Sequence, residues 1–186
     1  MGRRATSLAD RQYGTRSSDE VRATLLRLTL DFVCRARTLR GVARVALLGS
    51  LVTDKARPKD VDVLVTITED VDFTGLARLG RRLMGEAQGI NSGADVFLAD
   101  RAGVYLGRVC HYRECHPRML CHARHCGVRP HLNDDLDNVT IPPEVIATPP
   151  LVLHPIVAIA AAIPADVQTL LVAPLGTSLG PRSSSL

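Results

Sequence analysis

The stretch VALLGSLVTDKARPKDVDVLV limits the possible folds of this 186-residue chain more than any other part of its sequence. Residues 42–48 are mostly apolar and end at Gly49-Ser50, a dipeptide typical of a sharp turn. A polar loop follows, and residues 61–67 form a second apolar run that is rich in β-branched side chains. Two such runs separated by a loop predict neighbouring buried strands of one sheet.

Helical patterns lie on both sides of these strands. Ser17 and Glu20 have the spacing of a capping box, which predicts a helix that begins there and ends at Gly41. A second helix is predicted between residues 76 and 89, and a third strand is predicted over residues 94–99. The order helix, strand, strand, helix, strand predicts an α/β fold with a mixed β-sheet flanked by helices.

Asp60 and Asp62 are the side chains in this region that indicate chemistry. They lie two positions apart in the second strand, so their carboxylates are expected on the same face of the sheet. Two such carboxylates repel each other, and a hard cation such as Mg²⁺ relieves that repulsion and binds oxygen ligands. Gly49 permits close approach of the backbone, and Ser50 begins a turn whose free N–H groups suit a phosphate.

The same residues resemble the signature of the nucleotidyltransferase superfamily, which includes DNA polymerase β and kanamycin-type antibiotic nucleotidyltransferases. Leu48-Gly49-Ser50 and Asp60-Val61-Asp62-Val63 fit that signature, and nine residues separate them. The family's third carboxylate, on a later strand, is matched by Asp95 within Ala94-Asp95-Val96-Phe97. The resemblance covers residues 42–100 and is closest to the minimal nucleotidyltransferases of bacteria, including uncharacterised proteins that share a Cys/His-rich C-terminal extension.

This resemblance implies Mg²⁺-dependent transfer of a nucleoside monophosphate, expected to be AMP, from a nucleoside triphosphate to a hydroxyl of an unidentified acceptor. Gly49 and Ser50 would bind the triphosphate, and Asp60 and Asp62 would bind the ion that carries it. Together with Asp95 they would bind a second ion that activates the acceptor. Asp95 is also the candidate for taking the acceptor's proton. The acceptor is expected to be a small molecule or a partner protein.

Charge and apolar content leave other functions open. The net charge of +4 and the pI of about 9.0 permit an anionic ligand without requiring one. Two alternatives are an antitoxin-like regulatory binding module with weak or no catalysis, and a zinc-stabilised nucleic-acid-binding protein. The longest apolar run, 151–163, is too short to span a membrane. No apolar signal-peptide stretch follows Met1-Gly2-Arg3-Arg4, so a cytoplasmic location is expected.

Four cysteines lie close together after residue 100, as Cys110-x4-Cys115 and Cys121-x4-Cys126. In a reducing cytosol, thiols at such spacing favour a metal over disulfides, and four thiolates suit tetrahedral Zn²⁺. A histidine of the same segment is an alternative fourth ligand. The other interpretation is that these cysteines are packing residues.

These patterns divide the chain into five segments. They are a flexible arm (1–16), a nucleotidyltransferase core (17–102), a Cys/His-rich and zinc-binding extension (103–140), a Pro-rich segment with a short helix over Ile156–Leu171 that is broken or restarted at Pro164 (141–175), and a disordered tail (176–186).

If the four thiols hold one structural Zn²⁺, protein purified without added metal should contain about one zinc per chain. The segment has few large apolar side chains, so it depends on the metal for stability. Elemental analysis should show that Cys121→Ser loses the zinc and that the isolated Cys34→Ala keeps it. A zinc-free, folded protein with a melting temperature insensitive to chelators would identify the cysteines as packing residues.

Overall fold

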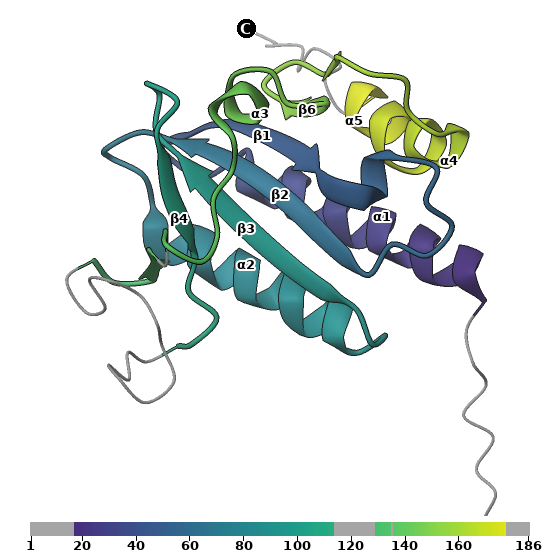
Figure 1. Ribbon diagram of the computed structural model, residues 1–186, viewed down its shortest axis with the longest axis horizontal. Coiled ribbons are helices and arrows are strands. Elements are labelled where there is room, and N and C mark those ends of the chain that lie inside the picture. Colours follow the sequence, from purple (N-terminus) through teal and green to yellow (C-terminus); the bar gives the residue numbers. More distant parts are fainter. Residues whose placement is uncertain (1–16, 114–128, 135, 178–186) are drawn as a thin grey trace, which may run out of the picture.

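The chain folds into an α/β structure in which helices cover a seven-stranded mixed sheet (Figure 1). The computed structural model describes residues 17–113, 129–134 and 136–177. The helical elements are α1 (Ser18–Ala36), the 3-10 turn η1 (Gly49–Val52), α2 (Phe73–Gln88), α3 (Pro143–Ala147), and a C-terminal helix made of α4 (Ala165–Val167), the π-helical η2 (Gln168–Val172) and α5 (Ala173–Thr177). The strands are β1 (Val42–Leu48), β2 (Asp60–Ile67), β3 (Gly93–Ala99), β4 (Tyr105–Val109), β5 (Leu132–Asn133), β6 (Leu151–His154) and β7 (Ala158–Ile159).

The strand order, β5-β4-β3-β2-β1-β6-β7, confirms the predicted α/β class and mixed sheet. Strands β2 and β3 are parallel and are connected through α2, whereas the other neighbouring pairs are antiparallel. In this register Asp62 pairs with Leu48 on one side and with Asp95 on the other. The sheet therefore brings the end of β1 next to the starts of β2 and β3.

Helix α1 begins with the predicted capping box. The Ser17 hydroxyl accepts from the Glu20 N–H at 3.2 Å, and the Glu20 carboxylate accepts from the Ser17 N–H at 2.9 Å. The helix ends at Ala36 and not at the predicted Gly41. Gly41 instead forms the turn into β1 with a φ of +76°, a backbone conformation that favours glycine.

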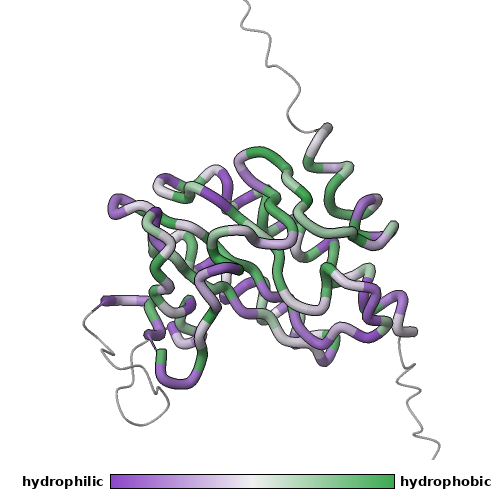
Figure 2. The backbone as a smooth tube through the Cα atoms, turned by 45° about the horizontal axis from the view of Figure 1, so that its top comes forward, coloured by the Kyte–Doolittle hydropathy of each residue, from purple (hydrophilic) through white to green (hydrophobic). Residues whose placement is uncertain are grey.

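The main core lies between the sheet and the layer formed by α1, α2 and the C-terminal helix. Val61 and Val63 of β2 point into this layer and are fully buried, as are Leu25 of α1 and Leu171 of η2. Figure 2 shows that hydrophobic stretches run through the middle of the molecule, while hydrophilic ones lie mainly on outer turns. This apolar face fixes which side of β2 carries Asp60 and Asp62, because alternate residues face opposite sides.

The opposite face of the sheet is covered only in part, by a smaller cluster around α3 (Figure 1). Leu48 and Leu64 pack there against Ile146 of α3. Arg44 of β1 donates to the carbonyls of Ile146 and Ala147 and so holds the C-terminal end of α3 on the sheet. Farther along β2 on this face, Asp60 is exposed. One end of this face is therefore accessible to a ligand.

The helix predicted over Ile156–Leu171, with a break or restart at Pro164, is confirmed only in its second half. The first half contains β7, which pairs with β6, and the helix begins after Pro164, where a restart was predicted. Proline has no N–H to continue a helix ladder, so it suits a helix start. The helix continues through Thr177, past the predicted start of the tail at residue 176.

The segments beyond residue 102 contribute strands that the sequence did not reveal. Strands β4 and β5 come from residues 103–140, and β6 comes from the Pro-rich segment 141–175. Strand β6 pairs with β1 and buries Leu151 and Leu153. Within the described ranges, none of the helices is both long and apolar enough to cross a membrane.

Candidate active site

The Gly49-Ser50 turn lies against the carboxylate of Asp62. Gly49 has a φ of +67° and follows the last residue of β1. A Cβ atom at this position would lie 2.0 Å from Oδ2 of Asp62, far inside van der Waals contact. The turn continues as η1, as predicted, with Ser50 half-buried. Both the backbone conformation and the adjacent carboxylate therefore require glycine here.

The three predicted aspartates start from neighbouring positions on one face of the sheet. Asp60 and Asp62 are two residues apart in β2, and Asp95 is the direct partner of Asp62 in β3. Adjacent strands lie about 4.8 Å apart, so these side chains are neighbours. A Cβ at Gly93 would lie 2.4 Å from Oδ1 of Asp60, so a second glycine makes room for a second carboxylate.

The carboxylate of Asp62 lies in an unfavourable electrostatic environment. Burial, together with the negative charges of Asp60 and Asp95, raises the pKa of Asp62 to about 6. Ionised Asp62 is thus disfavoured in the folded protein. A bound cation would remove this penalty, since it favours the charged form.

Asp95 has two positively charged or polar partners of its own. Its Oδ1 accepts from Nη1 of Arg108 at 3.0 Å and lies 3.1 Å from Nε2 of His111. Burial alone would raise the pKa of Asp95, but the His111 hydrogen bond and the Arg108 charge outweigh it and lower the pKa. Asp95 is therefore a weaker proton acceptor than a free carboxylate.

The donor set partly fits Mg²⁺. Carboxylate oxygens are its preferred protein ligands, and Asp60 and Asp62 form a repelling pair that a cation would stabilise. As placed, the side chains of the described part of the chain include no group of three His, Cys, Asp or Glu residues that could hold a metal. Asp60 and Asp62 are thus the residues suited to Mg²⁺, whereas Asp95 would join them only by sharing its carboxylate with Arg108 and His111.

The structure describes only one of the four predicted zinc ligands. Cys110 is half-buried just after β4. Cys115, Cys121 and Cys126 lie outside the described residues, so the four-thiol site stays a prediction.

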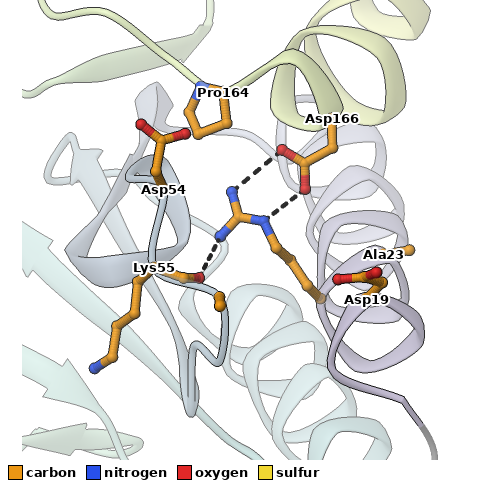
Figure 3. Close-up of a pocket in the computed structure, with 8 residues that line it drawn as sticks. Asp19, Ala23, Asp54, Lys55, Pro164 and Asp166 are labelled. Carbon is orange, nitrogen blue, oxygen red and sulfur yellow. Dashed lines mark hydrogen bonds and ion pairs between the residues drawn. The ribbon is translucent and has the colours of Figure 1, made fainter.

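One buried guanidinium joins the turn to two helices (Figure 3). Arg22 of α1 is 7% exposed and makes a two-pronged ion pair with Asp166 of α4, at 2.5 and 3.3 Å. It also donates to the carbonyls of Leu51 and Lys55, at 3.1 and 3.2 Å. These contacts border a cavity of about 440 Å³. Arg22 therefore holds the segment that follows the Gly49-Ser50 turn.

Sequence reasoning missed four residues that shape this site. They are Arg22, Asp166, Arg108 and His111. Arg22 and Asp166 are 144 positions apart, and no local pattern pairs residues at that separation. For Arg108, the only local signal was the alternation of side chains along β4. This alternation places Arg108 on the sheet face opposite to that of the buried Val109.

A comparison with protein families matches residues 7–123 to DUF6932, described as a family of unknown function. The chain belongs to the DUF6932 family. The DUF6932 match includes the turn at Gly49-Ser50, all three aspartates and the two partners of Asp95. No curated protein and no solved structure matches the chain.

The raised pKa of Asp62 predicts how Asp62→Asn changes stability with pH. Because the folded-state pKa of about 6 exceeds the ordinary 3.8, wild-type stability falls as pH rises through that window. Asparagine does not ionise, so the variant should escape this loss. In EDTA at pH 7.5 its melting temperature should exceed that of the wild type by on the order of 2–4 °C, the shift that about 1 kcal/mol produces at this size.

Thermal unfolding at pH 4 and pH 7.5 tests this expectation, and the difference between Asp62→Asn and the wild type should nearly vanish at pH 4. Asp54→Asn, at an exposed loop position, is the control and should give the same difference at both pH values. A pH-independent difference for Asp62→Asn would show that ionisation of Asp62 does not weaken the fold.

Proposed function

We propose that this DUF6932 protein is a nucleotidyltransferase that transfers a nucleoside monophosphate, most simply AMP, to an acceptor hydroxyl. The observation that carries the proposal is the contact between the Gly49 turn and Asp62, with Asp60 and Asp95 beside it on one sheet face. The arrangement of β1, turn, β2 and parallel β3 supports a nucleotidyltransferase fold as the finer description of this sheet. A triphosphate substrate suits a cytoplasmic protein.

The proposed reaction forms a bond between the acceptor oxygen and the α-phosphorus of a nucleoside triphosphate. The bond from that phosphorus to the oxygen bridging the α- and β-phosphates breaks, and pyrophosphate leaves with the electron pair. The acceptor's proton passes to a base, either solvent or a carboxylate of the site. Bound Mg²⁺ would supply neutralisation of phosphate charge and orientation of the acceptor for in-line attack.

The residues of the turn and of β2 have separate tasks in this proposal. The backbone N–H groups at Gly49 and Ser50 bind the terminal phosphates, and the close packing of Gly49 on Asp62 keeps those phosphates next to the carboxylates. Asp60 and Asp62 would hold Mg²⁺. Arg22 keeps the segment after the turn in place through its contacts with Leu51 and Lys55.

Asp95 acts on the acceptor side in this proposal. Its lowered pKa makes it a poor base, so its main task would be to help hold a second ion and orient the acceptor. Arg108 and His111 hold its carboxylate at the sheet edge toward β4. Its removal should therefore affect turnover more than binding of the triphosphate.

Asp60→Asn and Asp62→Asn should each abolish Mg²⁺-dependent binding of a nucleoside triphosphate and leave the fold intact, because each removes a charged oxygen ligand. Titration of ATP, GTP, CTP and UTP with and without Mg²⁺ measures this. Asp70→Asn, an exposed position beyond the other end of β2, should bind as the wild type does. Unchanged Mg²⁺-dependent affinity in both β2 variants would rule out this metal site.

Asp95→Asn should lower kcat by at least about tenfold while changing nucleotide affinity little, because an interaction made mainly with the acceptor is lost. The assay incubates purified protein with cell lysate and triphosphates labelled in the α-phosphate, and follows label in the acceptor and release of pyrophosphate. Absence of labelled product with all four nucleotides would contradict nucleotidyl transfer. Wild-type turnover in Asp95→Asn would remove Asp95 from the site.

A further inference from the structure

Arg81 of α2 is a half-buried arginine whose side chain lacks a full set of partners. Its Nη1 atom is buried and has no hydrogen-bond partner among the described residues. Burial lowers the pKa of Arg81, and the positive charges of Arg113 and Arg78 lower it further, opposed by Cys110. A buried guanidinium nitrogen without an acceptor is costly, and an anion bound near the accessible part of the same guanidinium would offset that cost.

Further basic side chains lie between Arg81 and the start of β5. Burial lowers the pKa of His131, and the charge of Arg81 adds to that effect, which places the two side chains near each other. The His131 ring lies 6.3 Å from the ring of Phe73, and the Arg129 guanidinium lies 5.4 Å from the centre of that same ring. We call Arg78, Arg81, Arg113 and Arg129 the arginine patch.

Arg82, the next residue of α2, differs from Arg81 because carboxylates neutralise its charge. Arg82 pairs with Glu86 at 2.9 Å and with Asp31 at 3.7 Å. No ion pair joins a member of the arginine patch to a carboxylate within the residues that the structure describes. Helix α2 covers the sheet face opposite the aspartates, so Arg78 and Arg81 lie away from the candidate active site, whereas Arg113 follows His111, a partner of Asp95, by two residues.

We propose that the arginine patch binds the phosphate backbone of a single-stranded nucleic acid. Its arginines come from α2, from the loop after β4 and from the residues before β5, so they can meet several phosphates in succession. Guanidinium groups bind phosphate oxygens in pairs. Tyr112, next to Arg113, is 41% exposed and offers a ring on which a base can stack.

Binding of a fluorescent single-stranded oligouridylate to the full chain tests this surface. The assay is done in EDTA without nucleotide, so it is independent of the proposed transfer reaction. At about 50 mM salt, Arg81→Gln should bind roughly tenfold more weakly, since it loses a charge-assisted contact. A plot of log affinity against log salt concentration should be less steep for Arg81→Gln than for the wild type, by about 0.7. This is the change expected when one phosphate contact to a single strand is lost.

Arg82→Gln removes the same charge from the next position of the same helix and is the matched control, expected to bind as the wild type does. Arg78→Gln, at an exposed position, should also weaken binding, which covers the case in which Arg81→Gln fails to fold. Asp60→Asn should bind the oligouridylate as the wild type does, so a failure of the nucleotidyltransferase proposal does not affect the proposal for the arginine patch.

Three results would overturn the proposal for the arginine patch. They are no binding by the wild type, equal losses of affinity in Arg81→Gln and Arg82→Gln, or displacement of the oligouridylate by pyrophosphate or polyglutamate at matched charge.

Discussion

The close packing of the Asp62 carboxylate on the backbone of Gly49 is the constraint on which the rest of the site depends. It joins the end of β1 to the start of β2 and fixes the direction in which the chain leaves the sheet. Glycine is required by both the positive φ and the adjacent oxygen. Because β3 lies parallel to β2 in register, the same packing sets the position of Asp95 relative to the turn.

This arrangement places three acidic side chains close together, and neighbouring positive groups neutralise their negative charges to different extents. Asp95 is held by Arg108 and His111, and its pKa is lowered, whereas the pKa of Asp62 is raised by burial and by its acidic neighbours. A fold selected only for stability gains nothing from the unfavourable ionisation of Asp62. Such a penalty is typical of functional sites, where a ligand supplies the missing charge.

The sequence predicted the parts of the fold that depend on local patterns. The capping box of α1, the strands β1 to β3 and the turn at Gly49 all follow from spacing and residue type within short windows. The strands β4 and β6 were missed because their residues lie among histidines, cysteines and prolines that hide the alternation. Contacts set by tertiary packing, such as Arg108 with Asp95 and Gly93 with Asp60, have no local signature.

The ion pair between Arg22 and Asp166 also has a consequence for the order in which the molecule folds. It closes a loop of 144 residues, and the entropy of bringing such distant positions together must be overcome after the nearer strand pairs have formed. We therefore expect the C-terminal helix to dock after the nearer strand pairs, when Val167, Leu171 and Leu175 reach the core. Without this helix, Arg22 would lose its counter-charge and, among the described residues, would keep only the carbonyls of Leu51 and Lys55 as partners.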